Sequence, residues 1–309
     1  MQILGMGNAI VDVICKVDEK FISQNNLTKS NMKLIFDENE FKNLLSNLKI
    51  EKTISGGSVA NSIVGLSQLG NKVGFIGKIS EDDFGEKYEI GLKKERVEYF
   101  YQKKVETLPT GTCLILITPD SERTMCTFLG IAGKINENDV DLEAIKKSDI
   151  IFLEGYLWDE GDPKKAFDKA ISNANKVAMT LSDKFCVDRH KSHFLNLVKN
   201  DLDIIFANED EISSLIDAKS FDEVISFGKK IKKQLIITRG EKGAISICSE
   251  KVSEVGINKD LKIIDLTGAG DLFAAGYLHG YLNNFSQEDC LKKGTEMASK
   301  VIQQIGARL

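Results

Sequence analysis

The chain has 309 residues, which is long enough for one large α/β domain or two ordinary domains. Hydrophobic residues make up 42% and charged residues 28%, a composition typical of a globular rather than a disordered protein. The net charge of -5 disfavours a nucleic-acid binder, because such proteins usually carry a basic excess. No apolar run approaches a membrane span and no signal peptide is visible. We therefore expect a cytoplasmic protein without membrane or nucleic-acid partners.

The six cysteines are scattered, and none forms a C-x-x-C pair. This pattern matches neither a zinc site nor a secreted disulfide framework, so we expect reduced thiols. With only three histidines, a histidine-based metal centre has few candidates.

The middle of the chain alternates short apolar strands with amphipathic helices. The predicted helices cover 58–69, 83–95, 163–175, 189–199, a short segment ending at 216, and 220–233. The predicted strands cover 73–77, 149–153, 177–181, 203–207 and 234–238. This alternation predicts a doubly wound, mostly parallel sheet with helices on both faces.

Two segments interrupt this alternation with β-rich sequence. Strands are expected at 10–17, 32–36, 97–103, 112–118 and 124–129, with a turn at 119–122. We predict a small β-sheet lid formed by residues 10–37 and 97–129. The predicted α/β core then consists of residues 1–9, 38–96 and 130–309.

A glycine-rich turn lies near the C-terminus, where residues 263–276 read IIDLTGAGDLFAAG. The pattern predicts a strand that ends at Asp265, a turn at 268–270 and a helix that starts near Asp271. Such a turn presents backbone N–H groups and the positive end of the helix dipole, which suits a phosphate or a developing anion. Taken alone, Asp271 is equally compatible with an ordinary helix-start carboxylate.

The segment Asp265-x-Thr-Gly-Ala-Gly-Asp271 resembles the C-terminal signature of the ribokinase-like (phosphofructokinase B-type) carbohydrate and nucleoside kinases. Three further motifs follow the order of that family: Gly56-Gly57-Ser58-Val-Ala-Asn61, Asn208-Glu-Asp-Glu211 and Thr238-Arg-Gly240-Glu-Lys-Gly243. The resemblance extends from about Gly5 to Ala307. No G-x-x-x-x-G-K-[ST] occurs, which disfavours a P-loop kinase.

The resemblance implies an ATP-dependent kinase that phosphorylates an alcohol group. Asp271 would accept the proton of the acceptor hydroxyl as it attacks the γ-phosphate of ATP. The N–H groups of Gly268, Ala269 and Gly270 would stabilise negative charge on the transferring phosphoryl group.

The resemblance also implies ligands for ATP and for cations. Asn208 and Glu211 would hold Mg²⁺, largely through water, although acidic residues at a helix start need no metal to explain them. Asn208, Thr238, Gly240 and Gly243 would contact ATP, and a plain strand-ending turn explains the last three equally well. Asp265 would help to frame a site for a monovalent cation such as K⁺.

Acceptor binding would fall to the N-terminal half of the chain. The implied acceptor ligands are Asn8, Asp12, Gly57, Ser58 and Asn61, with Arg123 reaching the phosphates from the lid. Tyr156 and Phe185 follow predicted strands and are candidates to flank a purine, while core or rim packing explains them equally well.

Within the family, Pro109-Thr-Gly-Thr-Cys113 and the opening residues 4–12 resemble the adenosine kinases. We therefore expect a nucleoside acceptor, with adenosine converted to AMP in purine salvage. A kinase for ribose, fructose or a related sugar is the alternative, and a non-catalytic nucleoside or sugar sensor is the second. The sequence leaves a monomer and a homodimer equally open.

Overall fold

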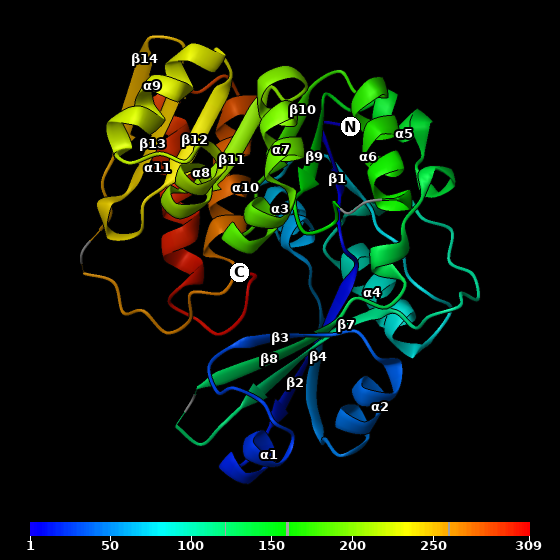
Figure 1. Cartoon of the computed structure of the whole chain (residues 1–309). Coiled ribbons are helices and arrows are strands. Elements are labelled where there is room, and N and C mark those ends of the chain that lie inside the picture. Colours follow the sequence, from blue (N-terminus) through cyan, green and yellow to red (C-terminus); the bar gives the residue numbers. More distant parts are fainter. Residues whose placement is uncertain (121, 159–160, 259) are drawn as a thin grey trace.

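The computed structural model describes residues 1–120, 122–158, 161–258 and 260–309, and it contains two β-sheets (Figure 1). The larger sheet has nine strands and the smaller has five. Within the part of the chain that is described, no helix combines the length and the apolar character needed to cross a membrane.

The nine-stranded sheet is mostly parallel. Its strands, in spatial order, are β14 (Lys251–Val255), β13 (Ala244–Cys248), β12 (Gln234–Thr238), β11 (Ile204–Asn208), β10 (Val177–Thr180), β9 (Ile150–Glu154), β1 (Ile3–Met6), β5 (Val73–Ile76) and β6 (Glu98–Tyr99). Pairing is parallel from β6 through β12, and β13 and β14 extend one edge by antiparallel pairing.

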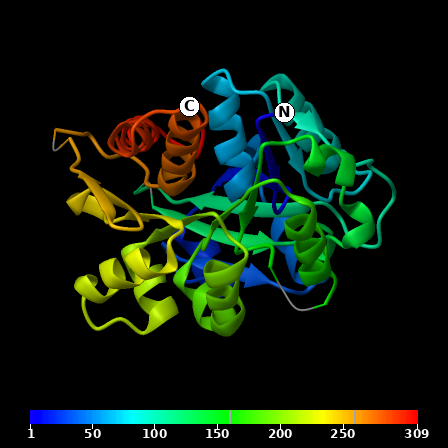
Figure 2. The ribbon, with the colours of Figure 1, turned by 90° about the horizontal axis from the view of Figure 1, so that it is seen from above.

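Helices cover both faces of this sheet, because neighbouring residues of each buried strand point to opposite faces. One face packs against α3 (Ser58–Gln68), α4 (Asp83–Lys94), α10 (Ala269–Leu282) and α11 (Gln287–Val301). The other packs against α5 (Leu142–Lys146), α6 (Asp162–Asn173), α7 (Lys184–Asn200), α8 (Glu209–Ile216) and α9 (Phe221–Ile231). Figure 2 shows α10 and α11 on one side of the sheet and α8 and α9 on the other.

The five-stranded sheet lies beside the large sheet, at the bottom of Figure 1. Its order is β3 (Met32–Ile35), β8 (Arg123–Phe128), β7 (Gly111–Ile117), β2 (Ile10–Lys16) and β4 (Ile50–Ser55). The same region of the chain carries α1 (Glu19–Gln24) and α2 (Glu38–Ser46). Helix α2 packs on this sheet, where the Phe41 ring stacks on Phe128 at 5.0 Å between centroids.

The predicted doubly wound α/β architecture with a small second sheet is confirmed. Two segments nevertheless belong to a different sheet from the one expected. Residues 50–55 lie within the predicted core, where no strand is predicted, but they form β4 and pair with β2 of the small sheet. Strand β6 was assigned to the lid, but it follows α4 directly and the crossover returns it to the large sheet beside β5. The division of the chain into a core and a lid stays a prediction.

The strand predicted to end at Asp265 is not formed. Residues 261–266 lie in irregular structure, and the N–H groups of Ile264 and Asp265 both donate to the Ile302 carbonyl, at 2.8 and 3.2 Å. Ile263 and Ile264 are 60% and 50% exposed. The predicted turn at 119–122 includes residue 121, which lies outside the described residues, while β7 and β8 pair antiparallel as that turn requires.

The aromatic core of the large sheet yields a test of stability. Phe152 on β9 is fully buried, and its ring meets Phe206 edge-on at 5.6 Å between centroids. We expect Phe152→Ala to lower the free energy of unfolding by about 3–5 kcal/mol, because the cavity cannot refill. Phe36→Ala, at a side chain that is 84% exposed, should change it by no more than about 0.5 kcal/mol. Urea denaturation of both variants measures the difference, and equal losses would contradict this packing.

Candidate active site

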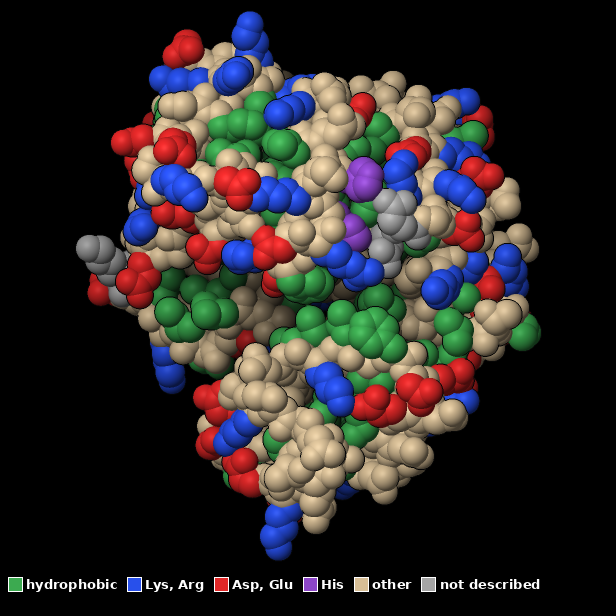
Figure 3. All heavy atoms as spheres, viewed as in Figure 1, with side chains coloured by type: hydrophobic (Ala, Val, Ile, Leu, Met, Phe, Trp, Pro, Cys, Tyr) green, Lys and Arg blue, Asp and Glu red, His purple; other side chains and the backbone are tan. Residues whose placement is uncertain are grey.

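A cavity of about 560 Å³ opens at the carboxyl ends of the parallel strands. Residues at or just beyond the ends of five of these strands line it: Asn8, Glu154, Thr180, Asn208 and Thr238. Side chains of the small sheet line it as well, so the cavity lies between the two sheets. The surface is visibly hollowed between these two parts (Figure 3). The carboxyl edge is where open α/β sheets bind ligands.

The start of α10 forms one wall of this cavity. Gly268 caps the helix with φ 78°, and a Cβ placed there would lie 2.6 Å from the Ala307 Cα. Glycine is therefore required by both the backbone conformation and the space. Gly268, Ala269 and Gly270 all line the cavity. The N–H groups of a first helical turn have no carbonyl partner within the helix, and here the Ala269 N–H donates at 3.2 Å to the Leu266 carbonyl, just before the helix. The wall thus offers the donors and the positive dipole end that an anion needs.

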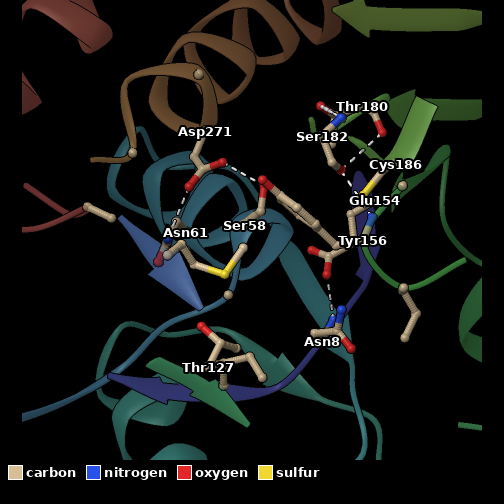
Figure 4. A pocket seen from close by; sticks show the side chains of 18 of the residues that line it. Asn8, Ser58, Asn61, Thr127, Glu154, Tyr156, Thr180, Ser182, Cys186 and Asp271 are labelled. Carbon is tan, nitrogen blue, oxygen red and sulfur yellow. Dashed lines mark hydrogen bonds between the residues drawn. The ribbon is translucent and has the colours of Figure 1, made fainter. Parts of the chain in front are cut away.

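Asp271, in the first turn of α10, is bound by two side chains of α3. Ser58 Oγ donates to Asp271 Oδ1 at 2.7 Å, and Asn61 Nδ2 donates to Asp271 Oδ2 at 3.0 Å (Figure 4). A third contact joins the helices, because Ser62 Oγ donates to the Asp271 carbonyl at 2.8 Å. Two motifs more than 200 residues apart are therefore joined at one carboxylate.

Burial controls the protonation of Asp271. It raises the pKa of this carboxyl group to about 6, against the opposing effect of the Asn61 and Ser58 hydrogen bonds and of the Arg308 charge. A carboxylate with this pKa is ionised at neutral pH and is still basic enough to accept a proton.

Asn8 and Asp12 lie on the side of the cavity that adjoins the small sheet, and both line it. Burial raises the pKa of Asp12 to about 7, the charge of Arg308 lowers it, and the nearby Asp271 raises it further. Among the described residues, Asn8 Oδ1 is a buried acceptor without a hydrogen-bond partner. A buried acceptor that faces a cavity and lacks a donor fits a ligand hydroxyl.

Gly56 and Gly57 bring the backbone close to the Asp12 side chain and the Asn8 backbone. Gly57 has φ 98°, and a Cβ there would lie 2.3 Å from the Asn8 carbonyl oxygen. A Cβ at Gly56 would lie 2.5 Å from Asp12 Oδ2. The glycine pair therefore allows α3 to begin directly against the strand ends.

Glu154 is a site residue that the sequence analysis missed. It ends β9, is 1% exposed, and accepts from the N–H groups of Asn8 at 2.8 Å and Val59 at 2.9 Å. Burial raises its pKa to about 7, and these backbone hydrogen bonds oppose the rise. An acidic residue at the end of the apolar run Ile-Ile-Phe-Leu was the available signal.

Asn208 and Glu211 form a capping box at the start of α8. Asn208 Oδ1 accepts from the Glu211 N–H at 2.8 Å, and Glu211 Oε2 accepts from the Asn208 N–H at 3.1 Å. Burial raises the pKa of Glu211 to about 7, with Asn208 opposing the rise. In residues 1–309 without the four undescribed positions, no cluster of three or more His, Cys, Asp or Glu could hold a metal. Carboxylate and amide oxygens still fit Mg²⁺, which keeps several waters and phosphate oxygens as ligands.

Four of the predicted site residues are not among the described residues that line the cavity: Arg123, Gly240, Gly243 and Asp265. Thr238 lines the cavity, but Gly240 and Gly243 are not among the described residues that line it. Gly243 instead packs on β14, where a Cβ would lie 2.0 Å from the Val255 carbonyl oxygen. Arg123 is ion-paired with Asp265, whose carboxylate also accepts from Thr267 and Gly306.

Burial alone would raise the pKa of Asp265, but these backbone and hydroxyl donors and the Arg123 charge hold it below its usual value. Asp265 thus faces a guanidinium here. Its predicted role in a cation site and the predicted phosphate contact of Arg123 stay predictions.

Aromatic and apolar side chains complete the wall. Tyr156 and Phe185 both line the cavity, with ring centroids 5.9 Å apart and an interplanar angle of 43°. The small sheet contributes Ile10, Met32, Leu34, Cys113 and Met125. The cavity therefore combines a polar end, with several carboxylates, and an apolar wall.

Comparison with known proteins shows the family of this chain. Residues 17–309 match the model of the pfkB family carbohydrate kinases. The chain belongs to the pfkB family. Its fold and the membership together identify it as a kinase that phosphorylates a hydroxyl acceptor, and the family implies ATP as co-substrate and typically Mg²⁺.

Proteins similar to this chain are named as kinases of different acceptors. A structure of adenosine kinase from Sinorhizobium meliloti is 35% identical with a TM-score of 0.89, covering 100% of this chain and 95% of that one. A probable sugar kinase from Rhizobium etli CFN 42 is also 35% identical with a TM-score of 0.89, covering 99% and 94%. A 5-dehydro-2-deoxygluconokinase from Clostridium botulinum is 28% identical over 84% of this chain and 81% of its own.

The cap of α10 yields a test with a matched control two residues away. We expect Gly268→Ala to lower the free energy of unfolding by about 1–2 kcal/mol or more, because its positive φ and the Ala307 backbone exclude a Cβ. Gly270→Ala should leave it unchanged or slightly higher, since a Cβ there meets nothing within 4 Å. Thermal and urea unfolding of both pfkB variants provide the measurement. A stable Gly268→Ala protein would show that this cap is not needed.

Proposed function

We propose that this pfkB protein transfers the γ-phosphoryl group of ATP to a primary hydroxyl of a nucleoside, with adenosine as the preferred acceptor and AMP as product. The observation that carries the proposal is the arrangement around Asp271: a buried carboxylate at the start of α10, in a cavity with a polar end and an aromatic wall.

The chemistry assigned to Asp271 follows from its surroundings. The carboxylate accepts the proton of the acceptor hydroxyl, whose oxygen bonds to the γ-phosphorus while the bond to the bridging oxygen breaks and ADP leaves. Its raised pKa, about 6, suits this role near neutral pH. The hydrogen bonds from Ser58 and Asn61 hold both carboxylate oxygens in place for the hydroxyl.

Negative charge on the transferring phosphoryl group would be stabilised by the start of α10. The N–H groups of Gly268, Ala269 and Gly270 and the helix dipole supply this field beside Asp271. Asn208 and Glu211, with Thr238 nearby on the cavity wall, would hold Mg²⁺ and the ATP phosphates, where the metal supplies charge neutralisation.

The wall of the cavity supports a nucleoside over a bare sugar. Asp12 and Asn8 offer acceptors for two ribose hydroxyls, and a carboxylate binds such a pair directionally. Tyr156, Phe185 and the sulfur and aliphatic side chains of the small sheet suit the flat face of a purine. The similarity to an adenosine kinase over the full chain agrees with this choice.

A sugar kinase is the second candidate. Relatives named 5-dehydro-2-deoxygluconokinase and a probable sugar kinase match most of the chain, and the polar end formed by Asn8, Asp12 and Asn61 suits a sugar without a base. The sensor alternative has no comparable observation in its favour, since Asp271 is present and the family is one of kinases.

Replacing the proposed base tests the mechanism. We expect Asp271→Asn to fold normally and to lose roughly 10²–10⁴-fold in turnover, because the amide cannot accept the proton. The wild-type turnover should rise with pH through about 6, as the Asp271 carboxyl group ionises. Asp222→Asn, at another helix start, is the matched control and should keep full activity. Coupled detection of ADP measures both variants, and near-full activity of Asp271→Asn would exclude this role.

A panel of acceptors decides between the two candidates. We expect ADP production to be fastest with adenosine, ahead of other nucleosides, ribose, fructose, fructose phosphates and 5-dehydro-2-deoxygluconate. Asp12→Ala should raise the acceptor KM roughly tenfold or more and leave the KM for ATP unchanged, because it removes hydrogen bonds to a charged group. Glu51→Ala, an exposed carboxylate on the same sheet, is the control. Preference for a sugar would favour the second candidate. If Asp12→Ala raised the KM for ATP alone, the acceptor and ATP sides of the cavity would have to be exchanged.

A further inference from the structure

Arg308, one residue before the last, reaches the acceptor side of the site without belonging to a helix or strand. Its segment is well held: the Gly306 N–H donates to Asp265 Oδ2 at 2.8 Å, and Gln304 Nε2 donates to the Arg308 carbonyl at 2.6 Å. Ala307 packs against Gly268 at the start of α10. Among the described residues, Ala307 lines the cavity and Arg308 does not.

The guanidinium of Arg308 fixes the orientation of the Asn61 amide. Arg308 Nε donates to Asn61 Oδ1 at 2.9 Å, and Arg308 Nη1 donates to Ser55 Oγ at 2.8 Å. Because a guanidinium can only donate, it selects the amide orientation in which Oδ1 faces Arg308. Asn61 Nδ2 then faces Asp271 and donates to its carboxylate at 3.0 Å. The reversed amide would place one oxygen against another.

The positive charge of Arg308 also acts on the carboxylates of Asp12 and Asp271. Asp12 on β2, Glu154 on β9 and Tyr156 beyond it interact electrostatically with Asp271, and Arg308 adds its charge from the C-terminal segment. Burial raises the pKa values of Asp12 and Asp271, and the guanidinium opposes both rises. Arg308 Nη2 is buried and has no hydrogen-bond partner among the described residues. The guanidinium is therefore buried with one of its nitrogens unpaired.

We propose that Arg308 is a positioning residue for phosphoryl transfer: it orients the Asn61 amide toward Asp271 and places a positive charge near this carboxylate. The inference rests on the proposed role of Asp271 as the base. Arg308 acts through Asn61 and through its charge, and it does not touch the acceptor.

Three substitutions separate the two effects. Arg308→Met removes both the donor and the charge, Arg308→Lys keeps the charge but loses the planar fork, and Arg308→Gln keeps a donor without charge. The exposed Arg96→Gln is the control for loss of an arginine elsewhere. Steady-state kinetics with the acceptor that the wild type uses best, measured from pH 5 to 9, supply kcat, KM and the acid limb of the kcat profile. Thermal unfolding checks that each variant is folded.

We expect Arg308→Met to lower kcat roughly 10- to 100-fold, with little change in the KM for ATP, as hydrogen bonds to a charged site are lost. Its acid limb should move up by about one pH unit, because Asp271 loses a nearby positive charge. Arg308→Gln should show the same upward shift. Arg308→Lys should keep the acid limb of the wild-type kcat profile and still have a lower kcat.

Two results would overturn the inference. An unchanged kcat and acid limb in folded Arg308→Met would exclude a positioning role. A raised acceptor KM with unchanged kcat would make Arg308 a binding contact instead. The Asp271→Asn variant keeps the two proposals apart: if it abolishes turnover while the Arg308 variants match the wild type, only the inference fails. If Asp271→Asn retains turnover and the wild-type limb, the proposed base itself fails.

Discussion

The contact between Asp271 and the first turn of α3 is the interaction on which the site depends. It joins Ser58 and Asn61, in the first third of the chain, to a carboxylate near its end. The two helices that carry these residues pack together on one face of the large sheet. Because α3 begins at the Gly56-Gly57 pair beside Asn8, the same contact ties the start of α10 to the acceptor end of the cavity. Any shift of α3 against α10 would separate the proposed base from the groups that orient it.

Several buried carboxylates share one cavity, and this sets the electrostatics of the site. Asp12, Glu154, Glu211 and Asp271 all line the cavity, and burial raises the pKa of each. A chain with a net charge of -5 must nevertheless accept a highly anionic nucleotide. Backbone N–H groups at the start of α10, with a metal ion supplied by the family chemistry, offer that charge locally. The guanidinium of Arg308 adds a positive charge at the acceptor end, near Asp12 and Asp271.

Local patterns predicted the elements that position the site. The apolar spacing at 58–69 and the Gly-Ala-Gly turn correctly indicated α3 and α10, because a helix cap and an amphipathic stripe are properties of neighbouring residues. Glu154 escaped because an acidic residue that ends an apolar run is a weak signal by itself, and its partners, the N–H groups of Asn8 and Val59, lie about 100 to 150 residues earlier in the chain. Arg308 escaped because its partners, Ser55 and Asn61, lie about 250 residues earlier in the chain. The predicted strand before Asp265 is not formed, because the N–H groups of Ile264 and Asp265 pair with the Ile302 carbonyl at the end of α11, a contact that local spacing does not reveal.

The sequence by itself determined the alternation of strands and helices, the fold class and the family motifs, since these depend on short-range spacing and on residues in a fixed order. The tertiary structure decided which sheet β4 and β6 join, and which carboxylates share one cavity. It also decided that Arg123 faces Asp265 and that Arg308 faces Asn61. Each of these depends on contacts between distant segments, where hydrogen-bond pairing and burial, rather than local propensity, select the partner.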